Sequence, residues 1–256
     1  MASRRDRAQR LASRAVQIGS LLVLFALWYL ATNFWGVNHL LLPNPVSVWR
    51  QLLDVLKSGA YLPDLRVTAT EFAAAFALAS LSGTVTGYVV SRSRYWIRVF
   101  EPLFAGIFSI PIILFLPLYV LFFGLGLESK IALGTTISFF PIVLATIAGF
   151  SNVDAMLVTA ARSMGASNYQ LFRYVLLPGA LPVIVGGLRI GFTIALLSIL
   201  GSETIASLAG LGHHIVELAE DMEMSRMFAY ITFVVVMVAL LNGIVSHLEA
   251  RGRRRG

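Results

Sequence analysis

Residues 159–178 read TAARSMGASNYQLFRYVLLP. The small residues at 160 and 161 permit close helix packing, Gly165 can turn the chain, and a second short helix would follow. Pro178 then opens the next helix at a favoured first-turn position. The pattern predicts a helix–turn–helix loop that suits a soluble partner, and an ordinary pair of interfacial helices between two membrane spans is the alternative interpretation.

The composition around this loop is that of a membrane protein. Of 256 residues, 57% are hydrophobic and 13% are charged, and the mean hydropathy is +0.80. These values exclude an ordinary soluble domain. The net charge of +7 does not indicate nucleic-acid binding, because the arginines lie in clusters that flank apolar runs. The absence of cysteine excludes disulfides and cysteine-ligated metal sites.

Six apolar segments are long enough to cross a membrane as helices. Together they occupy nearly all of the chain, so we expect an all-α membrane protein with one domain over residues 1–256. Short basic tails would remain at 1–14 and 249–256, and a more polar loop at 151–178. The six segments span approximately residues 15–35, 65–90, 99–123, 130–150, 178–200 and 227–248.

Individual segments carry further signals. The second contains Gly83 and Gly87, whose spacing lets helix backbones approach closely. The third contains three prolines and is expected to be kinked or broken. Residues 46–56 repeat apolar side chains at helical spacing and predict a short amphipathic helix on the membrane surface. We expect residues 201–225 to be the longest irregular stretch.

Basic residues predict the orientation of the chain. With the N-terminus inside, fourteen arginines would face the cytoplasm and five basic residues the opposite side. This bias agrees with the positive-inside rule. We therefore expect both termini and the 151–178 loop in the cytoplasm.

The 159–178 loop resembles the coupling loop of permease subunits of bacterial ATP-binding-cassette importers. The pattern of that loop is E-A-A-x-x-x-G, nine residues, then I-x-L-P, and the spacing here matches it throughout. Thr159 replaces the glutamate, a departure that affects any contact made by that carboxylate but not the helix–turn–helix. The matching positions are Ala160, Ala161, Gly165, Leu177 and Pro178, with Val175 replacing the isoleucine.

Other segments resemble the nitrate, sulfonate and taurine permease branch of this family. They are LLPNP at 41–45, FGLGLESK at 123–130, GLRIG at 187–191, and GLG at 210–212 downstream of Glu203. Their order and spacing extend the resemblance over nearly the whole chain.

The resemblance implies a type I importer permease fold in the inner membrane. It implies a homodimer forming one pathway, two cytoplasmic ATPase subunits that bind ATP and Mg, and a periplasmic or lipid-anchored solute-binding protein. This chain would hold no cofactor and catalyse no reaction, and it contains no G-x-x-x-x-G-K-[ST] motif. The ATPase-coupling residues would be Thr159, Ala160, Ala161, Gly165, Leu171, Phe172, Val175, Leu177 and Pro178.

Ionisable residues within spans are costly and usually face a cavity or a partner. Glu71, Arg189 and Glu203 therefore need an explanation. Glu203 would form a gate contact or bind solute, or its carboxylate would simply reach interfacial water. Arg189 would attract an anion or brace helix packing.

The third span also contributes to the expected path. Residues 108–112 align with an R-P-x-P-P segment of the branch but retain one proline and lack the arginine. We assign Ser109 and Pro111 to the path. A less charged aromatic or heterocyclic solute then becomes an alternative to a sulfonate, taurine or nitrate.

The remaining histidines and membrane acids bear on a metal site and on an alternative function. His213 and His214 are adjacent and lack an evident third ligand, so no metal site is predicted. An ion-coupled secondary carrier remains the alternative function, with Glu71 and Glu203 as its candidate membrane acids.

Overall fold

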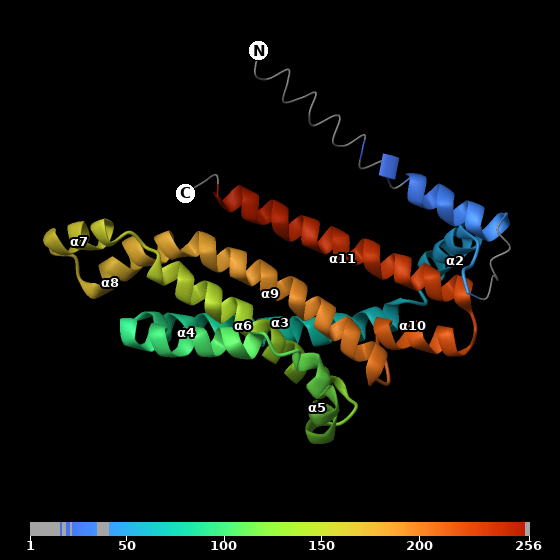
Figure 1. Cartoon of the computed structure of the whole chain (residues 1–256), viewed down its shortest axis with the longest axis horizontal. Coiled ribbons are helices and arrows are strands. Elements are labelled where there is room, and N and C mark those ends of the chain that lie inside the picture. Colours follow the sequence, from blue (N-terminus) through green and yellow to red (C-terminus); the bar gives the residue numbers. More distant parts are fainter. Residues whose placement is uncertain (1–15, 17–18, 21, 35–40, 254–256) are drawn as a thin grey trace, which may run out of the picture. The chain divides into compact units, whose positions relative to one another are not determined.

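The computed structural model describes residues 16, 19–20, 22–34 and 41–253, with the backbone alone from residue 248 onward. Every regular element in these ranges is a helix (Figure 1). The chain forms two compact units. The first comprises Met1–Tyr61 and Ile215–Val234, and the second comprises Leu62–His214 and Val235–Gly256.

The first unit contains an apolar helix, Leu22–Asn33, and α2, Pro45–Ser58. Asn44 caps α2 by accepting a hydrogen bond from the backbone N–H of Val46. The predicted helix is therefore confirmed, and its place on the membrane surface stays a prediction. Its buried core residues, Val48 and Leu52, pack with Ala229 of α11, Met224–Arg253.

Three long helices form the core of the second unit: α3, Leu62–Ser91; α6, Leu127–Ser151; and α9, Leu177–Ile205. Helix α6 packs against both α3 and α9, which also contact each other (Figure 1).

Glycines set how closely these helices approach. A Cβ atom at Gly83 of α3 would lie 2.9 Å from Ile142 Cγ2, and one at Gly191 of α9 would lie 2.6 Å from Ile142 Cδ1. At Gly87 a Cβ would lie 2.5 Å from Thr146 Cβ. The close approach predicted for Gly83 and Gly87 is confirmed, and α6 has a glycine contact on each side.

The third predicted span is broken. Helix α4, Arg94–Phe108, is followed by a 3-10 turn, η1, Ile112–Phe115, and by α5, Leu116–Phe123. The two halves are bent by 73°. The prediction of a break in this proline-containing segment is confirmed.

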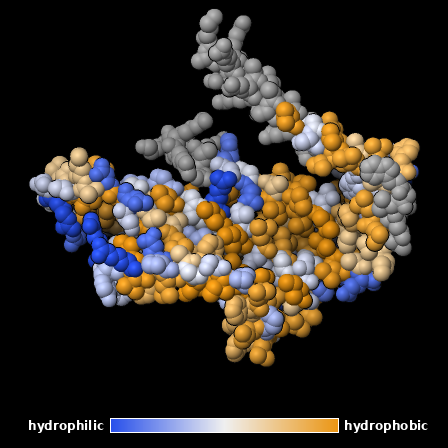
Figure 2. All heavy atoms as spheres, in the orientation of Figure 1, coloured by the Kyte–Doolittle hydropathy of each residue, from blue (hydrophilic) through white to orange (hydrophobic). Residues whose placement is uncertain are grey.

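Four helices in the described part of the chain are long and apolar enough to cross a membrane, and the bent pair makes a fifth. Of the predicted first span, the described helix is the shorter Leu22–Asn33, and residues 15, 17–18, 21 and 35 lie outside the described residues. Figure 2 shows hydrophobic residues over the surface of α5, where Leu121 and Phe122 are exposed. Such a surface suits lipid as solvent.

Two boundaries differ from expectation. Residues 201–225 are mostly helical, because α9 continues to Ile205 and α10 occupies Leu211–Glu220. The prediction of an irregular stretch there was wrong. Helix α11 extends through part of the expected C-terminal tail, whereas the expected tail at 1–14 lies outside the described residues.

Candidate functional site

The coupling loop contains two short helices, α7, Ala155–Ser163, and α8, Asn168–Leu171. Helix α7 begins at Asp154, whose side chain accepts a hydrogen bond from the N–H of Met156. It ends in a Schellman motif, with bonds from Gly165 N to Arg162 O and from Ala166 N to Ala161 O. Gly165 has a φ of 79°, so the predicted glycine turn is confirmed.

Helix α8 continues directly into the long apolar helix α9. Ser167 and Gln170 form a capping box at its start, and a π-turn, Phe172–Leu176, joins it to α9. The helical span runs without a break from Asn168 to Ile205. Pro178 lies in the first turn of α9, as predicted, although no gap separates α9 from the π-turn before it. The N–H of Leu177 donates to Phe172 O. This bond closes the wider π-turn directly before Pro178.

Some of the predicted ATPase-coupling residues anchor the hairpin formed by α7 and α8 to the rest of this chain. Ala161 and Leu171 are buried. The Phe172 ring lies 5.1 Å from that of Tyr88 in α3 and 6.3 Å from that of Phe150 in α6, measured between centroids. The resemblance implied an ATPase-coupling role for Leu171 and Phe172, but the contacts of these two side chains lie inside the chain.

The remaining predicted residues divide by exposure. Thr159, Ala160, Gly165 and Pro178 are exposed, whereas Val175 and Leu177 are half-buried. The hydroxyl of Thr159 donates to Ala155 O within α7, at 2.9 Å.

Sequence reasoning missed the large side chains that the hairpin exposes. Met164 is 82% exposed and Tyr169 71%. The sequence did contain a signal for these exposed side chains: large apolar residues occur on two helices that are too short to form a core of their own. The exposed set comprises Met156, Leu157, Met164, Tyr169 and Tyr174.

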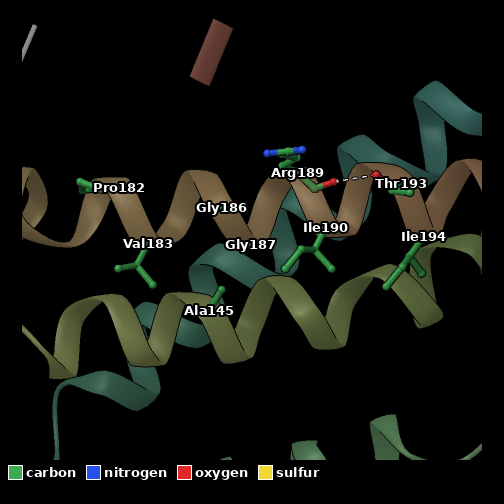
Figure 3. A pocket seen from close by; sticks show the side chains of 9 residues that line it. All are labelled: Ala145, Pro182, Val183, Gly186, Gly187, Arg189, Ile190, Thr193 and Ile194. Atoms are coloured by element: carbon green, nitrogen blue, oxygen red, sulfur yellow. Dashed lines mark hydrogen bonds between the residues drawn. The ribbon is translucent and has the colours of Figure 1, made fainter. Parts of the chain in front are cut away.

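An open pocket of about 830 Å³ lies along α9 and α6 (Figure 3). Figure 3 shows Val183 and Ile190 pointing toward α6, while the guanidinium of Arg189 lies on the opposite side of α9. Arg189 is exposed, although it lies in the interior of an apolar helix. The pocket is lined by Ala145, Pro182, Val183, Gly186, Gly187, Arg189, Ile190, Thr193 and Ile194.

Ser109 and Pro111 lie elsewhere, at the break between α4 and η1. Both are exposed, and the hydroxyl of Ser109 donates to Gly106 O at 2.6 Å. A second, apolar pocket of about 390 Å³ adjoins this break, with Ile110 and Ile112 in its lining. It shares no lining residue with the Arg189 pocket. The predicted path residues therefore do not form one cluster in the structure.

Glu203 lies at a third place, inside the second unit. It is 1% exposed. Its Oε1 atom accepts a hydrogen bond from the Thr68 hydroxyl at 2.6 Å, and its Oε2 atom accepts one from the N–H of Gly212 at 2.7 Å. The interpretation in which this carboxylate reaches interfacial water was wrong. A gate contact by Glu203 remains a prediction. Both of its carboxylate oxygens already accept hydrogen bonds from within the chain.

Two further ionisable residues are buried beside Glu203. Glu71 of α3 is 1% exposed, and its carboxyl group interacts electrostatically with that of Glu203. Lys130 of α6 supplies the opposite charge to both glutamates, and its ammonium donates to the carbonyls of Leu125 and Gly126. Three helices thus place a pair of acids and a lysine in one buried cluster, as the cost of burying charge requires. Sequence reasoning missed the lysine because it was assigned to the outer membrane surface.

The adjacent histidines, His213 and His214, lie half-buried in α10. Among the residues that the structure describes, no group of three or more His, Cys, Asp or Glu side chains could hold a metal ion.

Residues 75–254 match the family model described as "Binding-protein-dependent transport system inner membrane component". The taurine transport system permease protein TauC of Escherichia coli strain K12 is 31% identical over 241 residues, which cover 92% of this chain and 88% of TauC. The riboflavin transport system permease protein RibX of Chloroflexus aurantiacus is 29% identical over 193 residues, which cover 75% of this chain and 72% of RibX.

A solved structure shares the fold. The crystal structure of an amino acid ABC transporter with histidines aligns with a TM-score of 0.64 at 20% identity, over 80% of this chain and 98% of that one. With the family model matched over most of the chain and TauC among its relatives, this protein belongs to the binding-protein-dependent transport family, as an inner-membrane permease of the ABC importer type in the branch of the taurine and sulfonate permeases.

Proposed function

We propose that this chain is the membrane subunit of an ATP-driven importer and that it couples ATPase closure to alternating access. It works as a homodimer with two cytoplasmic ATPase subunits, which bind ATP and Mg, and receives solute from a periplasmic or lipid-anchored binding protein. Both termini lie in the cytoplasm, and the chain itself is not catalytic. The observation that carries this proposal is the capped α7–α8 hairpin, exposed at one end of the unbroken helix 168–205.

The hairpin has the two properties that a coupling element needs. Its outer surface presents Met164 and Tyr169, which offer apolar contact area to a partner groove. Its base is held to α3 and α6 through Phe172. A displacement of the hairpin by closing ATPases would therefore be passed to the packed helices as a rigid-body movement.

The solute is proposed to be a small organic compound or an oxyanion. TauC and RibX carry the names of an aminosulfonate and of a heterocyclic vitamin, so the branch admits both chemical types. Arg189 favours a path that admits negative charge, because its guanidinium adds a positive charge to the lining of the pocket along α9 and α6. Ser109 and Pro111 would line the path at the broken span, where the arginine of related permeases is absent.

The test uses the permease coexpressed with its cognate ATPase and binding protein and reconstituted in proteoliposomes. ATP-dependent uptake of radiolabelled taurine, nitrate or riboflavin would support the proposal, together with co-purification of a tagged ATPase. Uptake that persists when ATP hydrolysis is disabled would instead favour an ion-coupled carrier.

A glycine pair makes the test specific for the hairpin. Gly165 and Gly124 both have a φ of 79° with nothing within 4 Å of a Cβ atom, so valine at either position is strained in open space. Gly124 also has a ψ of −178°, a region that essentially only glycine occupies, so its substitution is a severe control. Gly165→Val is expected to abolish coupled uptake while the protein still inserts in the membrane. Gly124→Val, in the turn before α6, is expected to retain it, and equal losses in both variants would contradict a special role of the hairpin.

A further inference from the structure

The start of α10 is capped by side chains from distant parts of the chain. The N–H of Gly210 donates to Asp64 Oδ1 at 3.2 Å, that of Leu211 to Thr68 Oγ1 at 2.9 Å, and that of Gly212 to Glu203 Oε2 at 2.7 Å. The first N–H groups of a helix have no partner within the helix and are usually satisfied by a local cap or by water. Here the acceptors come instead from α3 and α9. We name Asp64, Thr68 and Glu203 the α10 clamp.

Thr68 links the members of the α10 clamp. Its hydroxyl donates to Glu203 Oε1 at 2.6 Å and accepts from Leu211 N, so one oxygen joins a residue of α9 to the backbone of α10. Thr68, Glu203 and Leu211 are all buried. Hydrogen bonds removed from water are costly to break, because the separated groups find no replacement partner.

The backbone approaches the carboxylate so closely that only glycine fits. A Cβ atom at Gly212 would lie 2.7 Å from Glu203 Cβ and 2.5 Å from Leu200 O. One at Gly210, where φ is 109°, would collide with the Glu203 carboxylate. The GLG sequence at 210–212 is thus explained by contact with Glu203 rather than by flexibility.

We propose that the α10 clamp makes the first turn of α10, Leu211–His214, move together with α9 during the transport cycle. Residues 168–205 form one helical span, so the coupling hairpin and Glu203 lie on the same continuous element. A movement that enters at the hairpin reaches the α10 clamp without an intervening joint. Thr68 and Glu203 are then positioning residues for transport, a role that rests on the proposed importer function.

The test exploits the absence of cysteine, which allows a single spin label to be attached to an introduced Leu208→Cys. Leu208 is 71% exposed and lies between α9 and α10, so a label there reports the mobility of the turn. The clamp is broken with Thr68→Val, which keeps the shape of the side chain and removes the hydroxyl. Thr68→Ser restores the hydroxyl. Thr70→Val is the matched control, because the Thr70 hydroxyl bonds only within its own helix, to Arg66 O.

Labelled permeases in nanodiscs give the mobility, and proteoliposomes containing the ATPase and binding protein give uptake. We expect Thr68→Val to mobilise the label and to lower ATP-dependent uptake by about tenfold or more, the effect of losing buried hydrogen bonds. ATPase binding should be retained, Thr68→Ser should recover both properties, and Thr70→Val should match the parent.

Two results would overturn the proposal: a label in Thr68→Val as immobile as in the parent, or a mobilised label with normal uptake. Failure of the importer function itself would be seen differently. The parent protein would then show no ATP-dependent uptake, whereas the label measurement on the permease alone would still report whether the α10 clamp holds the turn.

Discussion

Replacing Gly191 with alanine tests the packing of α9 on α6. The added methyl carbon would lie 2.6 Å from both Cγ1 and Cδ1 of Ile142. Contacting carbon atoms lie about 3.5–4.0 Å apart, so Ile142 or α9 must move by roughly 1 Å. Ile142 is fully buried, and on its other side it lies against Gly83 of α3. The displacement therefore strains both helix interfaces.

The magnitude follows from two opposing effects. Overpacking a core costs about 1–3 kcal/mol, and exchanging glycine for alanine inside a helix returns about 0.5–1 kcal/mol, so Gly191→Ala should destabilise by up to roughly 2.5 kcal/mol. Gly186→Ala, on the same helix, meets nothing within 4 Å and should stabilise by the helix contribution alone. The two substitutions are thus expected to have opposite signs.

The assay is the thermal unfolding midpoint of each purified variant in the same detergent. Ile142→Ala removes the atoms that the new methyl group would meet, so in that background Gly191→Ala should lose its penalty. Equal stabilisation by Gly186→Ala and Gly191→Ala, or a penalty that stays additive in the Ile142→Ala background, would refute the packing argument.

Two further predictions concern other parts of the second unit. Lys130→Met should lower the thermal midpoint, because it removes the buried ammonium that donates to the carbonyls of Leu125 and Gly126, and a hydrogen bond from a charged group is worth about 1.5–3 kcal/mol. Lys57→Met on the exposed face of α2 should leave the midpoint nearly unchanged, and similar midpoints in the two variants would contradict the role of the buried ammonium. Ser167→Ala should raise amide hydrogen exchange in α8, since losing an N-cap costs about 0.5–2 kcal/mol. Ser163→Ala, at the end of α7, should not, and unchanged exchange in Ser167→Ala would show that the capping box does not hold α8.

Features encoded by local chemistry were predictable from the sequence. The turn at Gly165 needs a positive φ, which glycine adopts without strain, and the spacing of Gly83 and Gly87 places both on one face of α3. The break in the third span follows from its prolines, although the sequence did not indicate which of the three would mark it. The structure places the break at Ser109–Pro111 and leaves Pro102 inside α4.

Features that depend on distant contacts were not predictable. The continuity of α8 with α9 requires a π-turn, whose Phe172 packs against rings from two other helices. The start of α10 has no local cap in the sequence, because its acceptors include Asp64 and Thr68, which precede it by more than a hundred residues. Hydropathy treats Lys130 as a surface charge, and only the tertiary structure shows that it faces two buried acids.

The packing of the second unit restricts how alternating access can work under the proposed function. At its glycine contacts α9 approaches α6 so closely that a methyl group does not fit, and α3 meets α6 in the same way. Interfaces of this kind resist sliding, because close-packed interiors deform little. Helices α3, α6 and α9 should therefore move as one body when the hairpin is displaced. The change in access must then come from elements joined less tightly, and we propose the exposed 73° break at Ser109–Pro111 as one such joint.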